Sequence, residues 1–324
     1  MITNTRDRIV EYIRESNQLR AHDLARLLNL SGTAIHKQLK KLINEGELEK
    51  IGRPPKVYYV LASKKVAKPK LVNPALLRVI NTRYLYISPT GEAKNGWDGF
   101  LAWCDKTKQD PIKTANEYLS TLNKFDKFKK NDLIDGMPKI KNTFKNVFLD
   151  KLYYLDFYSI ERFGKTKLGQ ILLYAKQSQN TSLINQLIIQ IRPEIIKVIK
   201  ENSIDGILFI PPTVKREIQF MKELEKQLAL PSRILSVTKI KTEIIVPQKT
   251  LSKLEDRIEN AKKTIIVEDK MRYKNVLLID DAVGSGATMN ETAKQIKNTN
   301  LVNGEIIGLA ITGSFKGFDV ISEV

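Results

Sequence analysis

The stretch VLLIDDAVGSGAT, residues 276–288, joins an apolar run to two adjacent carboxylates and a glycine-rich loop. Residues 276–279 have no polar alternation, which is typical of a strand that is buried on both faces of a parallel sheet. Asp280 and Asp281 follow at the carboxyl end of that strand, which is the edge where open α/β sheets bind their ligands. The stretch therefore predicts an α/β fold with a ligand site at this edge.

The loop after the two acids has the composition of an anion site. Gly284 and Gly286 let the backbone approach a ligand closely, and Ser285 and Thr288 add hydroxyl donors. Apolar positions at helical spacing over residues 289–297 predict a helix whose N-terminus would lie beneath the same anion. Because carboxylates repel a phosphate, the acid pair suits neutral hydroxyls and a divalent metal such as Mg²⁺. Together these features predict a sugar-phosphate site.

Residues 276–288 resemble the phosphoribosyl diphosphate (PRPP) signature of type I phosphoribosyltransferases. The resemblance implies that Asp280 and Asp281 hold the ribose hydroxyls and, indirectly, Mg²⁺. It also implies that the 5′-phosphate is bound by a loop made of Ala282, Val283, Gly284, Ser285, Gly286, Ala287 and Thr288. Gly284 departs from the Thr or Ala that is frequent in the family. The alternative is a strand-turn-helix junction with incidental acids, while a Walker A motif is excluded because no Gly-Lys-Ser/Thr follows the loop.

A second candidate anion site precedes the first. From residue 153 onward, strands and helices are predicted to alternate, which is the mark of a parallel sheet. A buried strand at residues 206–210 is followed by PPTVKR, residues 211–216, which combines a stiff turn, a hydroxyl and two cations. In the phosphoribosyltransferase resemblance this is the pyrophosphate loop, with Pro212, Thr213, Lys215 and Arg216 as ligands. Lys215 and Arg216 would then share catalysis with the acid pair.

The segment PQKTLSKLEDRIEN, residues 247–260, is similar to the ComF-like branch of the same family. That resemblance covers roughly residues 153–312 and implies a flexible loop whose functional residues are Gln248, Arg257 and Asn260. ComF relatives typically begin with a cysteine-rich zinc region, and this chain has only Cys104. The departure argues against a role in DNA uptake. The arrangement is instead similar to the purine operon repressor type, in which a winged helix precedes a phosphoribosyltransferase-fold domain that senses PRPP.

The first 62 residues show three helical patterns followed by a hairpin. The helices are expected at residues 5–15, 21–28 and 32–44, and the strands at residues 48–51 and 57–61. The pattern resembles a winged helix-turn-helix domain. The resemblance implies that the third helix presents Thr33, His36, Lys37 and Lys40 to double-stranded DNA, and that Arg53 and Lys56 at the hairpin tip reach phosphate. The alternative is a domain of this kind that mediates protein contacts, and operator symmetry would favour a homodimer.

The length and composition of the chain indicate its domain organisation and its compartment. The 324 residues predict an α+β winged-helix domain (1–62), a linker and helical connector (63–150) and an α/β phosphoribosyltransferase domain with a parallel sheet (151–324). The net charge of +18 is weak support for nucleic acid binding, because lysine outnumbers arginine 40 to 14, as codon bias alone would produce. A single cysteine, no membrane-length apolar run and a polar N-terminus predict a cytoplasmic protein without membrane contact.

Two functions from different classes remain open from the sequence. The first is an enzyme that transfers phosphoribosyl from PRPP to a base or amine and releases pyrophosphate. The second is a transcriptional regulator that senses PRPP or a nucleotide without turnover. His22 and His36 are the only histidines, so any proton transfer at the candidate site would use a carboxylate or solvent. Phe315 and Phe318 in the tail would either stack on a base or pack internally.

Overall fold

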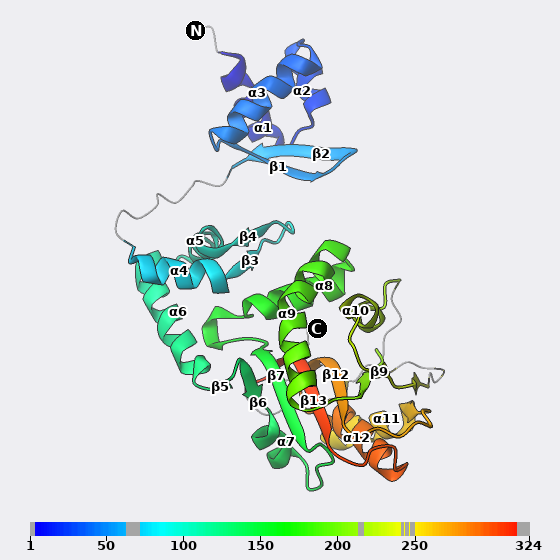
Figure 1. The fold of residues 1–324 in the computed structure, drawn as a ribbon. Coiled ribbons are helices and arrows are strands. Elements are labelled where there is room, and N and C mark those ends of the chain that lie inside the picture. Colours follow the sequence, from blue (N-terminus) through cyan, green and yellow to red (C-terminus); the bar gives the residue numbers. More distant parts are fainter. Residues whose placement is uncertain are drawn as a thin grey trace.

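The computed structural model describes residues 4–62, 72–212, 217–240, 243, 246 and 250–315. The N-terminal part consists of α1 (Thr5–Ser16), α2 (Ala21–Leu28), α3 (Gly32–Asn44) and the antiparallel hairpin β1 (Leu48–Arg53) with β2 (Lys56–Leu61) (Figure 1). These elements match the order and bounds expected from the sequence to within a few residues. Across the described ranges, none of the helices is long and apolar enough to cross a membrane.

The N-terminal unit has a core of its own. Its apolar residues recur at helical spacing, and Ile9, Ile13, Ile35 and Leu39 are buried against each other, so each helix contributes one face. Ser31 caps α3, since its hydroxyl accepts a hydrogen bond from the Ala34 amide at 3.2 Å. This hydrogen bond fixes where α3 begins.

The segment between this unit and the main sheet contains four helices and two short hairpins. The helices are α4 (Pro74–Arg83), α5 (Gly96–Thr107), α6 (Pro111–Asp126) and α7 (Met137–Thr143). The hairpins are β3 (Leu85–Ile87) with β4 (Ala93–Asn95), and β5 (Lys129–Lys130) with β6 (Leu133–Asp135). Because β6 pairs with the first long strand of the main sheet, the expectation of a purely helical connector is incomplete.

The main sheet has seven strands in the order β5-β6-β7-β13-β12-β8-β9. The five strands from β7 to β9 in this order run parallel to one another, and β5 and β6 form an antiparallel edge. Their bounds are β7 (Lys151–Phe157), β8 (Gly206–Phe209), β9 (Arg233–Ile234), β12 (Val276–Val283) and β13 (Ile306–Gly313). The mixed α/β class with a mostly parallel sheet, expected from the alternation of strands and helices, is confirmed.

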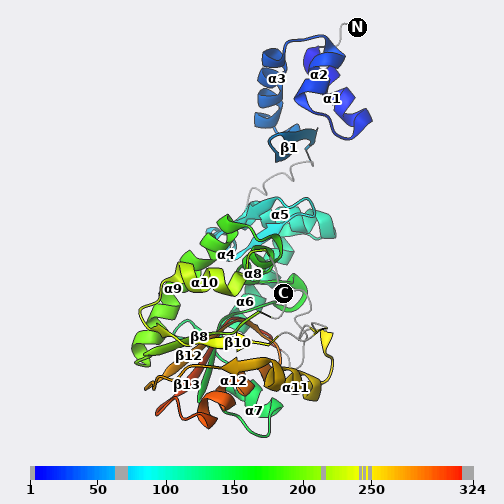
Figure 2. The same ribbon diagram turned by 90° about the vertical axis from the view of Figure 1, so that its right-hand side faces the viewer.

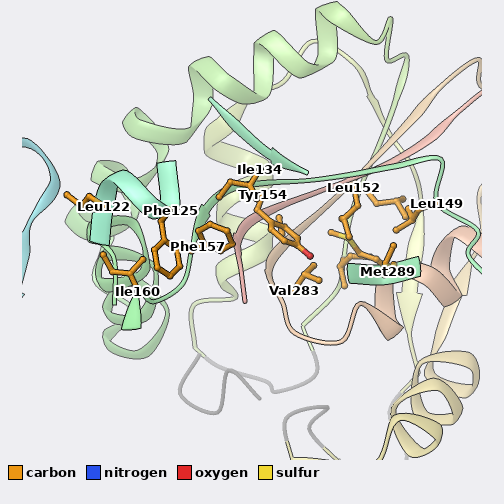
Figure 3. Close-up of a cluster of buried hydrophobic side chains, with 14 of the residues drawn as sticks. Leu122, Phe125, Ile134, Leu149, Leu152, Tyr154, Phe157, Ile160, Val283 and Met289 are labelled. Carbon is orange, nitrogen blue, oxygen red and sulfur yellow. The ribbon is translucent and has the colours of Figure 1, made fainter. Parts of the chain in front are cut away.

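Helices cover both faces of this sheet (Figure 2). One face packs against α8 (Lys167–Ser178), α9 (Thr181–Glu201) and α10 (Phe220–Leu228), and a short 3₁₀ helix, Glu161–Phe163, precedes them. The other face packs against α7 and α12 (Ala287–Asn298), and α11 (Leu254–Thr264) lies on α12. Figure 3 shows part of this second core, where Tyr154 of β7 lies beside Val283 and Leu152 lies near Met289 of α12.

A small antiparallel pair stands apart from the main sheet. It joins β10 (Val237–Lys239) to β11 (Ile265–Val267), and the chain between them includes α11. The Ile240 amide also donates to the Thr264 carbonyl at 2.7 Å, which ties the end of β10 to the end of α11.

The strand order creates a point where the chain leaves neighbouring strands in opposite directions. After β8 the chain passes through α10 to β9 at one edge, whereas after β12 it passes through α12 to β13 toward the other edge. In open α/β sheets, a crevice forms at such a point outside the carboxyl ends of the strands, and ligands bind there. A ligand site is therefore expected at the carboxyl ends of β8 and β12.

Candidate functional site at the ends of β8 and β12

The acid pair lies where β12 loses one of its neighbours. Val276–Ile279 are buried and pair with both β8 and β13, as expected for a strand covered on both faces. Pairing with β8 ends at Ile279, while β13 continues beside β12 as far as Val283. Asp280 and Asp281 are thus still part of β12, but they lie beyond its pairing with β8.

Two lysines from different elements balance the two acids. The Nζ atom of Lys176, on α8, lies 2.5 Å from Oδ2 of Asp281. Lys239, at the end of β10, interacts electrostatically with Asp280. The Asp281 amide donates a 2.8 Å hydrogen bond to Oδ1 of Asp280, which links the two acids directly. The site therefore carries two carboxylates and two ammonium groups before any ligand is considered.

Burial shifts the titration of this cluster. Desolvation and, next, repulsion from the Asp281 carboxylate raise the pKa of Asp280 to about 7, although Lys176, the Asp281 amide and Lys239 act against the rise. Desolvation also lowers the pKa of Lys239, and the Asp280 carboxylate opposes that change. Because perturbed pKa values of this kind gather at functional sites, the cluster is a stronger candidate than the sequence motif alone.

The loop after β12 leads directly into α12. Gly286, the residue before the helix, has φ of 83°, a left-handed conformation that favours glycine. Gly286 is the N-cap residue and has no side chain that could cap α12. The Ser285 hydroxyl, one residue earlier, accepts a hydrogen bond from the Ala287 amide at 3.3 Å. The positive end of the α12 dipole thus lies at the loop, as an anion site requires.

The other predicted loop residues are either half-buried or buried. Ala282, Gly284 and Thr288 are half-buried, whereas Val283, Ser285 and Ala287 are buried. The side chain of Val283 packs in the core beneath the loop (Figure 3). Ser285 is 7% exposed, so its hydroxyl serves the loop's own backbone in this structure.

Helix α7 lines the far side of this loop. A Cβ atom placed on Gly286 would lie 3.1 Å from Cδ1 of Ile140, so the helix packs directly on the turn. Lys139, one residue earlier, donates a hydrogen bond to the Ser314 hydroxyl, and the Ser314 amide donates to the Val283 carbonyl at 3.3 Å. A cation from α7 therefore lies close to the loop, which the sequence motif does not include.

The end of β8 lies beside the acid pair. Phe209 is the register partner of Ile279, and the Ile210 amide donates to the Ile279 carbonyl at 2.9 Å. Pro211 and Pro212, both half-buried, follow immediately. The structure thus brings the first two residues of the predicted pyrophosphate segment to the same edge as Asp280. Thr213, Lys215 and Arg216 lie outside the described residues.

The predicted flexible-loop residues are distributed differently from the expectation. Arg257 and Asn260 both lie on α11, which packs against α12, and Gln248 lies outside the described residues. Arg257 is 5% exposed, and its Nε donates to the Leu251 carbonyl at 2.7 Å. In the structure these two residues therefore belong to a packed helix rather than to an open loop, because the apolar face of α11 is buried.

The donor set at the acid pair fits a shared Mg²⁺ better than a resident metal. Within the described ranges, no group of three or more His, Cys, Asp or Glu side chains could hold a metal ion. Mg²⁺ commonly binds through one or two carboxylates together with water and the phosphate oxygens of a substrate. Asp280 and Asp281 supply such carboxylates, so a ligand would have to contribute the remaining oxygens.

The predicted DNA-binding residues are all exposed. Thr33, His36, Lys37 and Lys40 recur at helical spacing on α3 and share one outward face. Arg53 and Lys56 are register partners at the tip of the β1–β2 hairpin. None of these four basic residues of α3 and the hairpin, Lys37, Lys40, Arg53 and Lys56, makes a salt bridge within the described part of the chain.

Comparison with known proteins adds no name to this geometry. No protein-family model matches the chain, and no curated protein matches it.

Sequence reasoning missed Lys176 and Lys239. Both reach the acid pair from elements distant along the chain, and neither stands in a recognisable motif. For Lys176 the only available signal was its position near the end of a helix that follows a strand of the same sheet.

Proposed function

We propose that residues 151–315 bind PRPP with Mg²⁺ at the carboxyl ends of β8 and β12 and transfer its phosphoribosyl group to a base or amine. The observation that carries this proposal is the adjacency of three features. An acid pair, a glycine turn at a helix N-terminus and the Pro211-Pro212 segment all lie at one point where the sheet connections diverge. Each matches one part of PRPP: the ribose diol, the 5′-phosphate and the pyrophosphate.

Binding would assign the charges of PRPP to separate parts of the site. Asp280 and Asp281 accept hydrogen bonds from the ribose hydroxyls, because carboxylates are good acceptors for neutral donors. The first amides of α12 and the loop from Ala282 to Thr288 receive the 5′-phosphate. Mg²⁺, held through the acid pair and the ligand, would neutralise negative charge that develops on the pyrophosphate. Thr213, Lys215 and Arg216 remain the proposed ligands of the pyrophosphate group.

The proposed transfer breaks one bond and forms another at C1 of the ribose. The C1–O bond to pyrophosphate breaks, and its electron pair leaves with the pyrophosphate. The lone pair of the acceptor nitrogen forms the new C1–N bond, and the proton of that nitrogen passes to a carboxylate or to solvent. Since the transition state has oxocarbenium character, the protein's contribution is to orient the reactants, stabilise the leaving charge and exclude water.

A second function has an observation of its own. Exposed basic side chains occupy one face of α3 and the hairpin tip, which supports the proposal that residues 5–62 are a winged helix that binds double-stranded DNA. The whole chain would then be a transcriptional regulator whose DNA affinity changes when PRPP or a nucleotide binds. Such coupling requires the ligand to bind the free and the DNA-bound forms with different affinities.

One experiment separates the two functions. The protein is incubated with PRPP, Mg²⁺ and a panel of purine and pyrimidine bases and amines, and pyrophosphate release is followed. Turnover with any acceptor supports the enzyme, and saturable PRPP binding without turnover supports the sensor. Release that persists in the Asp280→Asn/Asp281→Asn variant would mean that the activity comes from elsewhere.

A further inference from the structure

Lys176, on α8, pairs with Asp281 of the acid pair. Its ammonium contacts the Asp281 carboxylate at 2.5 Å, and the two side chains are only 19% and 14% exposed. Both charges are therefore largely shielded from bulk water. Their Coulomb attraction is stronger there than on an exposed surface, and loss of either partner would leave the other charge unpaired.

The end of α8 fixes Lys176 relative to the segment after β8. Gln179 ends α8, and its Oε1 accepts a 2.6 Å hydrogen bond from the Ile218 amide. At the other end of that segment, the Ile210 amide is bonded to Ile279, one residue before the acid pair. Lys176 is in the last turn of α8, three residues before Gln179. The described residues next to this segment are therefore bonded to two elements that also carry the ion pair: Ile210 to β12, and Ile218 to the end of α8.

Ligand binding at the acid pair would change the electrostatic partner of Lys176. When the ribose hydroxyls and Mg²⁺ engage Asp281, the carboxylate has less negative charge to share with the ammonium. A cation held at low exposure then gains free energy by moving to another anion within reach of its flexible stem. In the proposed binding mode, the pyrophosphate group of PRPP lies beside the Pro211-Pro212 segment, at the same sheet edge as the acid pair.

We propose that Lys176 is a pyrophosphate ligand, exchanging its contact with Asp281 for a phosphate oxygen when PRPP binds. This inference rests on the proposed PRPP site and adds to it a cation from α8, outside the loops that the sequence motifs indicate. In the empty protein, Lys176 stabilises the acid pair. In the complex, it stabilises the group that leaves.

The test compares three ligands in the presence of Mg²⁺ by titration calorimetry: pyrophosphate, PRPP and ribose 5-phosphate. Lys176→Gln and Lys176→Met remove the charge, and Met also retains most of the apolar stem. Loss of one charge-assisted contact should weaken pyrophosphate and PRPP by about tenfold or more. Ribose 5-phosphate, which lacks the pyrophosphate, should change by less than about threefold, because its contacts are neutral or lie at the α12 loop.

Lys222→Gln, an exposed lysine on the neighbouring α10, is the matched control and should leave all three affinities unchanged. Equal losses for ribose 5-phosphate and PRPP would overturn the inference, since Lys176 would then act only through Asp281. Unchanged pyrophosphate affinity in a folded Gln or Met variant, judged by its melting temperature, would overturn it as well. If the wild type binds none of the ligands, the proposed function itself fails.

Discussion

Phe209 and Ile279 are the last register partners of β8 and β12, and Asp280 is the first residue beyond that pair. Up to this point both strands are buried in the sheet, and beyond it β8 turns away while β12 continues against β13. Asp280 therefore keeps a register partner in β13, Ala310, but has none in β8. The position of the acid pair therefore follows from where two strands of unequal length part.

The first prediction concerns Asp280 and the pH dependence of stability. Its pKa is raised to about 7, whereas an unfolded Asp has a pKa near 3.9. Between these values the folded protein binds more protons than the unfolded chain, so the free energy of unfolding falls as pH rises from about 4 to 7. Asp280→Asn removes the ionisable carboxyl group and therefore also this fall in the free energy of unfolding. The variant should unfold at a higher denaturant concentration than wild type at pH 8, with little difference near pH 4.

The measurement is urea unfolding of both proteins across that pH range. Each unit of pKa elevation corresponds to about 1.4 kcal/mol, so the difference should be readily detected. Asp132→Asn, at an exposed position, serves as the control and should follow the wild-type curve. A loss of stability in Asp280→Asn at pH 8 would contradict the assignment of a destabilised carboxylate.

The second prediction concerns Lys239. Its charge lowers the pKa of Asp280, so Lys239→Met should raise that pKa further. Mg²⁺-dependent PRPP binding needs the ionised Asp280 carboxylate. The affinity for PRPP should therefore increase with pH in both proteins, and the increase should occur at a higher pH in the variant than in wild type. Calorimetric titrations from pH 6 to pH 9 would show the displacement. Superimposable profiles would mean that Lys239 has no influence on the acid pair.

The third prediction concerns Gly286 and distinguishes the cost of a left-handed backbone from the cost of a steric clash. Gly286 and Gly91 have nearly the same φ, 83° and 82°, but a Cβ atom would meet Ile140 at 3.1 Å in the first case and nothing within 4 Å in the second. Alanine at either position should cost about 1 kcal/mol for the left-handed backbone. Gly286→Ala should cost more, and it should also weaken ribose 5-phosphate binding. Equal stability losses with unchanged binding would indicate that the turn does not face a ligand.

The fourth prediction concerns the hairpin tip. Arg53→Ala with Lys56→Ala removes two exposed cations, so binding to double-stranded DNA should weaken and its salt dependence should flatten. If each contacts one phosphate, the slope of log affinity against log salt should fall in magnitude by about 2. Lys106→Ala with Lys113→Ala, two exposed lysines of α5 and α6, removes the same charge and should have little effect. Absence of binding by wild type at low salt would remove the regulator proposal.

Local signals explain which parts of the fold could be predicted from sequence. The bounds of α2 and α3 follow from apolar spacing and from a cap at Ser31, all of which are properties of neighbouring residues. The buried strand before Asp280 likewise shows as an unbroken apolar run. By contrast, β5 and β6 have two and three residues, which is too short for any period to appear, so their place in the sheet depends on pairing with Tyr153 and Tyr154.

At the candidate site, too, the features that are local in sequence could be predicted and those that depend on tertiary contacts could not. The acids and the glycine turn are contiguous in sequence, and the structure keeps them together at one edge. Lys176 and Lys239 reach the acids only through the folding of α8 and β10 around the sheet, so no local pattern could identify them. Arg257 was expected in a flexible loop because of the ComF-like resemblance, but it lies on α11, where helix formation and packing against α12 bury it.

The most direct measurement of the central claim is calorimetric titration of PRPP into the wild type and into Asp280→Asn/Asp281→Asn, each with Mg²⁺ and with a chelator. We predict saturable binding by the wild type that requires Mg²⁺, and no detectable binding by a variant whose circular dichroism shows that it is folded. Retained Mg²⁺-dependent binding by the variant, or absence of binding by the wild type, would contradict a PRPP site at the end of β12.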